Sequence, residues 1–155
     1  MTAANHMLTG AVIAVGLQRP LWVLPAAFVS HFVLDVLPHF GVHHKNNAER
    51  DAHPLFKSVL IIDIVLALLI LVVVPLVFHQ TVNWWIVFTG MLIAWVPDTV
   101  WLRHFWHDRR GVKRTEPVWL TRFHQKIQWF EKPPGLILEV LWLGAMSFWL
   151  RALIV

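Results

Sequence analysis

The chain has 155 residues and a formal net charge of +4; 57% of its residues are hydrophobic and only 14% are Asp, Glu, Lys or Arg. Together with a mean hydropathy of +0.60, this composition excludes an ordinary soluble domain, in which about a quarter of the residues are charged, and predicts a membrane protein. Ten tryptophans without a tyrosine fit an aromatic belt at the membrane interfaces. The absence of cysteine excludes disulfides and thiolate metal ligands.

The first apolar segment, residues 3–38, is long enough for two membrane passes. In its middle, "GLQRP" at 16–20 supplies a glycine, two polar residues and a proline, a combination typical of a turn. We therefore expect a helical hairpin, with helices at about 3–18 and 21–38. No basic residue precedes the first apolar run and no small-residue cleavage site follows it, so we expect this segment to stay in the protein.

Three later segments also have the roughly 20 apolar residues needed to cross about 30 Å of hydrocarbon. We expect helices at about 57–78, 82–103 and 135–155. The sequence thus predicts an all-α fold, a polytopic membrane helical bundle of five membrane helices that forms a single domain over residues 1–155.

An interfacial helix is expected at about 117–131, between the last two membrane helices. Its apolar side chains fall within an arc of about 100° on a helical wheel, and basic residues flank them. This pattern is typical of an amphipathic helix that lies in the headgroup region. The apolar set is Trp119, Leu120, Phe123, Ile127 and Phe130, and the flanking residues are Arg122 and Lys126.

The basic residues predict the orientation of the bundle. Five crossings place loops 39–57 and 103–134 on the same side, and the other side carries only Arg19 and Arg151. The positive-inside rule then assigns the two long loops to the cytoplasm. Since the positive charge serves topology, we expect no nucleic-acid partner. The side with the long loops carries Lys45, Arg50, Lys57, Arg103, Arg109, Arg110, Lys113, Arg114, Arg122, Lys126 and Lys132.

Acidic side chains from four helices are expected at one depth. Counted at 1.5 Å per helical residue, Asp35, Asp63, Asp98 and Glu139 lie roughly 4–8 Å below the cytoplasmic surface. His31, at about 10 Å, and His6, a few residues into the first helix, belong to the same half of the bilayer. Such groups in hydrocarbon cost several kcal/mol each, on the order given for buried polar groups, unless something binds them. We therefore expect these side chains to converge.

The segment "SHFVLDVLPHF" at 30–40 is the centre of this prediction. His31 and Asp35 are four residues apart and share a helix face, and His39 continues that line past Pro38. Imidazole and carboxylate without thiolate suit a divalent metal ion, zinc or manganese by preference and iron as an alternative, and the surplus of carboxylates allows one ion or two. The expected metal ligands are His6, His31, Asp35, His39 and Asp98.

Three further side chains are predicted as catalytic groups of the same centre: Asp63, His124 and Glu139. The interfacial helix would hold His124 over the mouth of the site. Simpler interpretations stay open: Asp63 and Glu139 could each be hydrogen-bonded to a neighbour, and Asp98 could cap a turn. For the loop histidines a ligand role is left open beside simple solvation; these are His43, His44, His53, His104 and His107.

With "NHMLTG" at 5–10, "SHFVLDVLPHF" at 30–40 and "PD" at 97–98, the chain resembles the small bacterial and archaeal inner-membrane proteins described as membrane-bound metal-dependent hydrolases. The resemblance covers the first 40 residues and the later Pro97 and Asp98. It implies a multi-pass fold in the inner membrane of a prokaryote and metal-assisted hydrolysis. The positions that it carries over are His6, His31, Asp35, His39 and Asp98.

The expected function is hydrolysis of a phospholipid-like or other anionic amphiphile near the cytoplasmic leaflet, because a basic loop containing Arg109 and Arg114 would flank the site. The expected partners are therefore membrane lipids and an anionic, lipid-like substrate. The histidine-rich "HFGVHH" at 39–44 and "HFWH" at 104–107 give an alternative, a resemblance to di-iron lipid desaturases and hydroxylases. A transporter of metal ions or protons is the non-enzymatic alternative, although the outer half of the bundle has few polar residues for a pathway.

Overall fold

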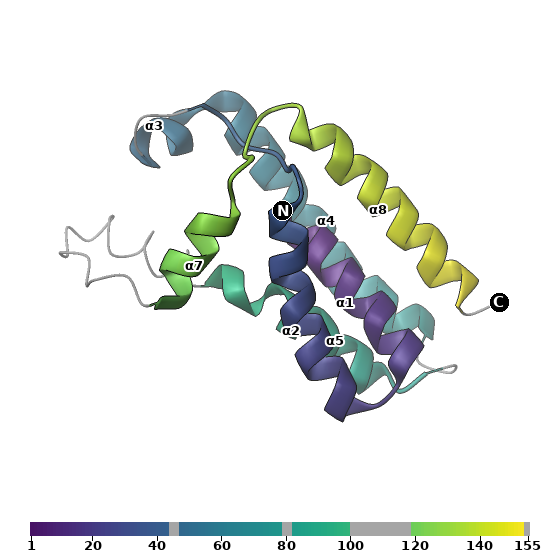
Figure 1. Cartoon of the computed structure of the whole chain (residues 1–155). Helices are drawn as coiled ribbons and strands as arrows, with labels where there is room; N and C mark the ends of the chain where they lie inside the picture. The colour runs from purple at the N-terminus through teal and green to yellow at the C-terminus, as the bar shows by residue number, and fades with distance from the viewer. Residues whose placement is uncertain (44–46, 79–81, 100–118, 154–155) are drawn as a thin grey trace.

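The computed structural model describes residues 1–43, 47–78, 82–99 and 119–153, and the elements within these ranges are all helical, which confirms the all-α fold class (Figure 1). In chain order they are α1 (Ala3–Leu17), α2 (Pro20–Val36), α3 (Asn47–Ala52), α4 (Pro54–Phe78), α5 (Trp84–Trp95), the 3-10 turn η1 (Val96–Asp98), α7 (Trp119–Ile127) and α8 (Gly135–Ala152).

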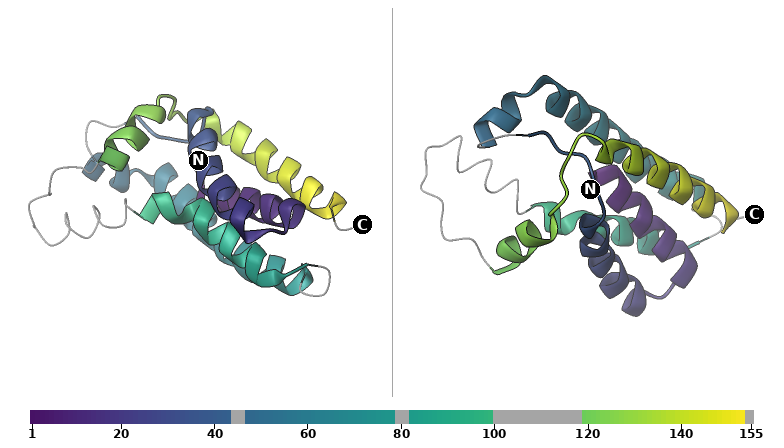
Figure 2. Two further views of the ribbon diagram at one scale, coloured as in Figure 1. Left: turned by 60° about the horizontal axis from the view of Figure 1, so that its bottom comes forward. Right: turned by 45° about the horizontal axis from the view of Figure 1, so that its top comes forward.

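Helix α1 is the centre of the bundle. It packs against α2, α4, α5 and α8, and both views of Figure 2 show it among these helices. Ten of its 15 residues are buried, on every side of the helix, as expected for an element enclosed by neighbours. Gly10 of α1 meets Gly90 of α5 so closely that a Cβ on Gly10 would lie 2.5 Å from the Gly90 carbonyl oxygen. The lack of side chains at this crossing therefore sets the distance between the two helices.

The expected hairpin at the N-terminus is present as α1 and α2. Gln18 ends α1 in the left-handed conformation, with φ of 50°, and its N–H donates to the Ala14 carbonyl. Pro20 then opens α2 at a position where a missing N–H costs nothing. At its other end α2 stops at Val36, two residues before Pro38.

Two of the described helices are long and apolar enough to cross a membrane: 54–77 of α4 and α8. Three others are apolar but shorter, namely α1, α2 and α5 with η1. The helix expected at 82–103 is α-helical only to Trp95, because Pro97 cannot continue the hydrogen-bond ladder and the chain tightens into η1. Residues 100–118 lie outside the described ranges.

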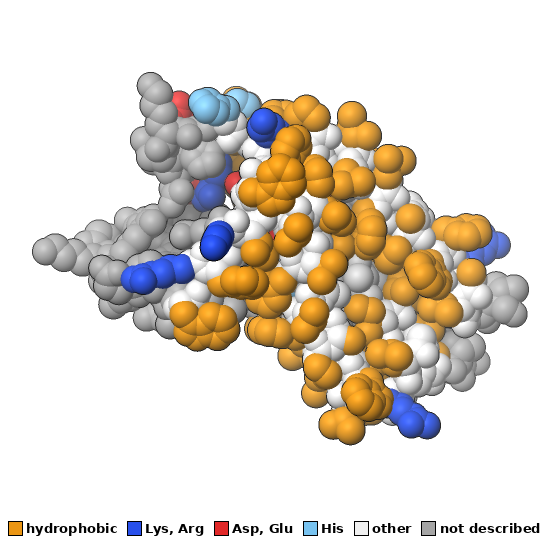
Figure 3. All heavy atoms as spheres, viewed as in Figure 1, with side chains coloured by type: hydrophobic (Ala, Val, Ile, Leu, Met, Phe, Trp, Pro, Cys, Tyr) orange, Lys and Arg blue, Asp and Glu red, His pale blue; other side chains and the backbone are white. Residues whose placement is uncertain are grey.

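Apolar side chains cover the outside of the bundle. Figure 3 shows them over the middle of one face, with lysine and arginine side chains toward its two ends. Large apolar residues on several helices are more than half exposed, among them Leu21, Leu76 and Phe148. An apolar belt of this extent is the signature of a surface that contacts hydrocarbon or a partner.

Helix α7 lies within the segment where the sequence predicts an interfacial helix. Its apolar face is partly open, with Trp119 at 74% exposure, and just past its end the Trp129 indole N–H donates to the Val36 carbonyl at 2.9 Å. α7 packs against α2, and Figure 1 shows it beside the bundle, separate from α8.

Candidate metal centre

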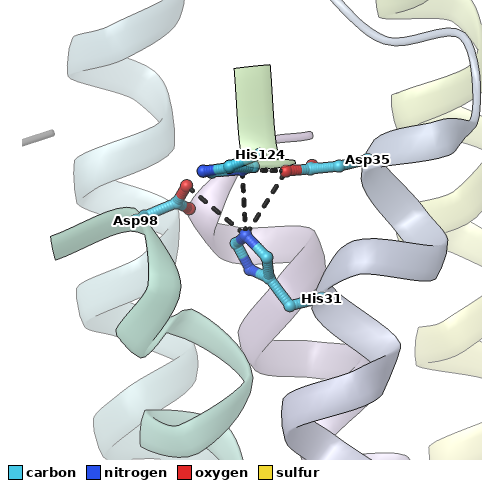
Figure 4. Close-up of side chains that lie close together, drawn as sticks. All are labelled: His31, Asp35, Asp98 and His124. Atoms are coloured by element: carbon cyan, nitrogen blue, oxygen red, sulfur yellow. Dashed lines mark hydrogen bonds and ion pairs between the residues drawn. The ribbon is translucent and has the colours of Figure 1, made fainter. Parts of the chain in front are cut away.

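Histidine and carboxylate side chains from α2, η1 and α7 converge at one end of the bundle (Figure 4). His31 and Asp35 come from consecutive turns of α2, Asp98 from η1 and His124 from α7. Each offers one nitrogen or oxygen atom, and these atoms all lie within 4.8 Å of one another. This spacing allows a single ion to contact all four side chains.

Asp35 is the middle of the group. Its Oδ2 lies 3.3 Å from His31 Nε2 and in short contact with His124 Nε2. The two imidazole Nε2 atoms are 3.2 Å apart, and His31 Nε2 is 3.8 Å from Asp98 Oδ1. The positively charged amino group of Met1 also contacts Asp35, so nitrogen atoms surround this carboxylate from several directions.

The tautomer of His31 is fixed by the backbone of α5. Its Nδ1 lies 2.9 Å from the Ala94 carbonyl oxygen, which can only accept a hydrogen bond, so Nδ1 carries the proton. In the neutral imidazole the lone pair is then on Nε2, which points at Asp35, Asp98 and His124 (Figure 4). A ring N–H donated to a backbone carbonyl is the usual outer-sphere partner of a metal-bound histidine.

His6 of α1 extends the group on its buried side. Its ring stacks on His31, with the centroids 4.0 Å apart, and its Nε2 lies 3.2 Å from Asp35 Oδ1 and 4.0 Å from Asp98 Oδ2. The direction to Asp35 does not suit a hydrogen bond, and neither ring nitrogen of this fully buried side chain has a hydrogen-bond partner. Unpartnered buried nitrogens are costly, and an ion held by the neighbouring carboxylates would satisfy Nε2.

The described residues therefore fit a divalent metal ion. Three imidazoles and two carboxylates meet without thiolate, which is a donor set for zinc, manganese or iron. His31 and Asp35 are fully buried, while the Asp98 side chain is 27% and the His124 side chain 15% exposed. One side of the group is thus accessible to a water molecule or a substrate.

Sequence reasoning predicted His6, His31, Asp35 and Asp98 as ligands, and the structure brings these four together. It adds His124, predicted as a catalytic group, at the distance of a ligand. Gln128 is a neighbour that the sequence analysis missed: its Nε2 donates to Asp35 Oδ2 at 3.3 Å. Gln128 follows His124 by about one helical turn and shares its face of α7, and this spacing could have indicated Gln128 from the sequence.

His39, by contrast, does not reach the group. Its Nδ1 lies 2.8 Å from the Leu37 carbonyl oxygen and its Nε2 lies 3.4 Å from Glu131 Oε1, so both ring nitrogens are directed at these oxygens and away from the metal group. Its backbone pairs with the segment after α7, through N–H to the Phe130 carbonyl and carbonyl to the Lys132 N–H. His39 joins the segment that follows α2 to the segment that follows α7.

The ion pair of His39 with Glu131 gives a pH-dependent prediction. Burial by itself would raise the pKa of Glu131, but the hydrogen bond and charge of His39 hold this pKa below its ordinary value. The pair therefore contributes stability above the ordinary glutamate pKa, and this stability is lost as the pH falls through the lower folded pKa. Glu131→Gln should lower the free energy of unfolding by about 0.2–1 kcal/mol at neutral pH.

Thermal unfolding in detergent at pH 7 and in steps to well below pH 4.5 tests this expectation. The difference between the wild type and Glu131→Gln should shrink as the pH drops below the ordinary value of 4.5. A constant difference over the whole range would assign the effect to packing rather than charge.

Asp63 of α4 caps the first turn of α1 instead of joining the group. Its Oδ2 accepts from the Ala3 N–H and its Oδ1 from the Ala4 N–H, both at 2.9 Å. These N–H groups have no partner within the helix. A negative charge at this position is also attracted to the positive, N-terminal end of the helix dipole. The hydrogen bonds that the sequence left open for Asp63 are present, and through them Asp63 fixes the end of α1 that carries His6; its catalytic role stays a prediction.

Replacing Asp63 with alanine should lower the free energy of unfolding by about 0.5–2 kcal/mol, the range for lost N-terminal caps. Metal affinity should change far less than in variants of the group itself, because Asp63 touches α1 and not the ligands. Thermal unfolding and equilibrium dialysis against zinc measure the two effects. A loss of zinc as large as that of a ligand variant would show that Asp63 acts in the site.

Glu139 of α8 likewise contacts backbone. Its Oε1 accepts from the Phe40 N–H at 3.1 Å, and its own carbonyl accepts from the Asn5 side chain at 3.1 Å. The second carboxylate oxygen, Oε2, is buried without a hydrogen-bond partner. One turn later the Trp142 indole donates to Thr9 at 3.0 Å, so Glu139 belongs to the contacts that hold α8 against α1.

Comparison of the chain with protein-family models, with characterised proteins and with solved structures finds no match in any of the three. The resemblance to membrane-bound metal-dependent hydrolases therefore stays a prediction. Of the loop histidines, His43 and His53 are exposed. His44, His104 and His107 lie outside the described residues, as does the basic segment around Arg109 and Arg114.

Proposed function

We propose that this protein is a membrane-embedded, metal-dependent hydrolase that acts on a phospholipid-like or other anionic amphiphile near the cytoplasmic leaflet. The observation that carries the proposal is the meeting of His6, His31, Asp35, Asp98 and His124 at one end of an apolar helical bundle. Zinc or manganese fits this donor set best, as one ion or as two.

The membrane topology is part of the proposal. α4 and α8 cross the bilayer, and the shorter α1, α2 and α5 with η1 are the remaining passes of a five-helix bundle. At 15 residues α1 is roughly 22 Å long, less than the hydrocarbon thickness of about 30 Å. A short helix of this kind can cross where its neighbours, rather than lipid, surround it, and α1 packs against α2, α4, α5 and α8.

A divalent ion bound to the group would lower the pKa of a bound water and polarise a phosphoryl or acyl oxygen. The side chains of the group would have different roles in this reaction. His31 and Asp35 are held rigidly by burial and by the Ala94 carbonyl. Asp98 lies on the accessible side, where the carboxylate oxygen that does not hold the ion would accept the proton released during hydrolysis.

Hydrolysis is favoured over transport by where the ionisable side chains lie. Among the described residues, the buried ionisable groups are His6, His31, Asp35, His39 and Glu139, and all of them belong to the half of the bundle that carries the metal centre. A transport pathway requires polar groups through the full thickness of the membrane. The core that continues below the site consists of apolar residues, including Met91, Val87 and Val23.

Metal removal and replacement test the proposal directly. The protein purified in detergent should contain at least one zinc or manganese ion per chain by elemental analysis. It should hydrolyse at least one member of a set of long-chain phosphate and carboxylate esters presented in mixed micelles. Chelation should abolish this activity, and one of the two ions should restore it.

A protein that binds neither ion after dialysis against both contradicts the proposal. Iron as the bound metal, with turnover that requires oxygen, would instead support the alternative of a di-iron lipid oxidase.

A further inference from the structure

A cavity of about 510 Å³ lies between α1, α4 and α5 and reaches the metal centre. Asp98 belongs to both, since it is a member of the metal group and also lines the cavity. The remaining wall is formed by apolar side chains apart from Asp63, whose two carboxylate oxygens are hydrogen-bonded to α1. The lining residues are Met1, Ala3, Met7, Phe56, Leu60, Asp63, Ile64, Ala67, Leu68, Leu71, Leu92, Trp95 and Asp98.

The cavity runs along α4 from Phe56 to Leu71, and Leu71 marks the end farther from the metal centre. From Asp63, level with the start of α1, to Leu71 is eight residues, which is about 12 Å of helix. The wall beyond Asp63 includes Ala67 and Leu68, and across it stand Leu92 and Trp95 of α5. Asp63 and Asp98 are thus the acidic residues of the cavity, and the part between them and Leu71 is apolar.

The wall is also open toward the surroundings of the bundle. Leu68 lines the cavity and is 58% exposed, and Ile64 is 49% exposed. In a membrane these side chains face hydrocarbon, so a lipid chain can enter sideways without crossing water. A volume of this size falls within the range of about 300–1,000 Å³ typical of ligand pockets.

We infer that this cavity holds one hydrocarbon chain of an amphiphilic substrate, with the polar group of that substrate at Asp98 and the chain extended toward Leu71. The inference rests on the proposed function, because the metal centre gives the polar end of the cavity its role. Lipid tails are as apolar as the cavity, so binding there gains little over the bilayer. The cavity instead orients the substrate and brings its head to the site.

Photo-crosslinking tests where the chain lies. The probe is a long-chain fatty acid with a diazirine near its methyl end, added to the zinc-loaded protein in phosphatidylcholine nanodiscs. Labelled peptides should concentrate on the cavity wall, at Leu71 of α4 and Leu92 of α5. Equal labelling of the outer apolar faces of α4 and α8 would overturn the inference.

Two neighbouring leucines of α4 give a matched pair of variants. Leu68 lines the cavity, whereas Leu69 does not and is similarly exposed, at 53% against 58%. Leu68→Trp should lower labelling of the cavity wall on the order of tenfold, since the indole takes up part of the space that the chain would enter, and Leu69→Trp should leave it unchanged. An equal response of the two variants would also overturn the inference.

Metal content measured on the same samples separates the two proposals. Bound zinc with labelling spread evenly over the outside overturns the chain site and leaves the metal centre standing. Labelling confined to the cavity in a protein that binds neither zinc nor manganese overturns the hydrolase and supports the chain site. Folding of each variant is checked by its helical circular dichroism and its elution as a single species.

Discussion

Asp35→Asn is expected to reduce the affinity for zinc or manganese by at least about 100-fold, the upper range reported even for residues one shell away from a metal. The amide has almost the same shape as the carboxylate but lacks its charge, and Asp35 is the side chain that His6, His31 and His124 all approach. Ester hydrolysis should fall with the bound metal. Equilibrium dialysis followed by elemental analysis measures the first effect, and turnover at saturating metal measures the second.

The matched control is Asp51→Asn in α3, which removes one negative charge from a side chain that pairs with Arg50. It should bind metal as the wild type does. Because a buried polar change at Asp35 can also disturb folding, Asp98→Asn serves as a second test: this side chain is 27% exposed and its loss should lower metal affinity in a fully folded protein. Full metal occupancy in both site variants would refute the metal centre.

Gly10→Ala is expected to destabilise the bundle and to weaken metal binding although residue 10 touches no ligand. The added methyl group would lie 2.5 Å from the Gly90 carbonyl oxygen and 2.9 Å from the Ala94 Cβ, so α1 and α5 must move apart. Overpacking of this kind costs about 1–3 kcal/mol. It also separates His6, one turn earlier on α1, from Asp98 and from the Ala94 carbonyl that fixes His31.

Gly16→Ala is the control on the same helix, because a Cβ there would meet nothing within 4 Å. Alanine is a better helix former than glycine by about 1 kcal/mol, so this variant should be as stable as the wild type or more so. Thermal unfolding and metal affinity are compared for the two variants. If both behave alike, the close crossing of α1 and α5 does not determine the site.

Some parts of the site follow from the sequence because they are local. The spacing of His31 and Asp35 places both on one face of α2 whatever surrounds the helix. Counting residues from the ends of apolar segments predicted that His6 and Asp98 lie near the same end of the bundle, and they meet there. The amphipathic pattern of α7 predicted a helix that holds His124 over the site. The pattern did not predict how close His124 lies to Asp35.

For three other predicted site residues, the residue count predicted the depth of the side chain but not its partner. Asp63 and Glu139 lie in the expected half of the bundle, yet both face backbone N–H groups, of Ala3 and Ala4 and of Phe40 respectively. His39 stands in line with Asp35 by sequence spacing, but Pro38 ends the helix and the chain leaves toward Glu131. A residue count gives the height of a side chain along a helix and not the direction in which it points.

The sequence by itself determined that the protein is helical, that its long apolar helices suit a membrane, and that histidines and acids are available at one depth. These properties depend on composition and on the period of a single helix, which neighbours do not alter. Only the tertiary structure decided which of these groups meet. The rotation of each helix about its axis comes from contacts such as Gly10 against Gly90, and such contacts join segments far apart in the chain, so no local pattern encodes them.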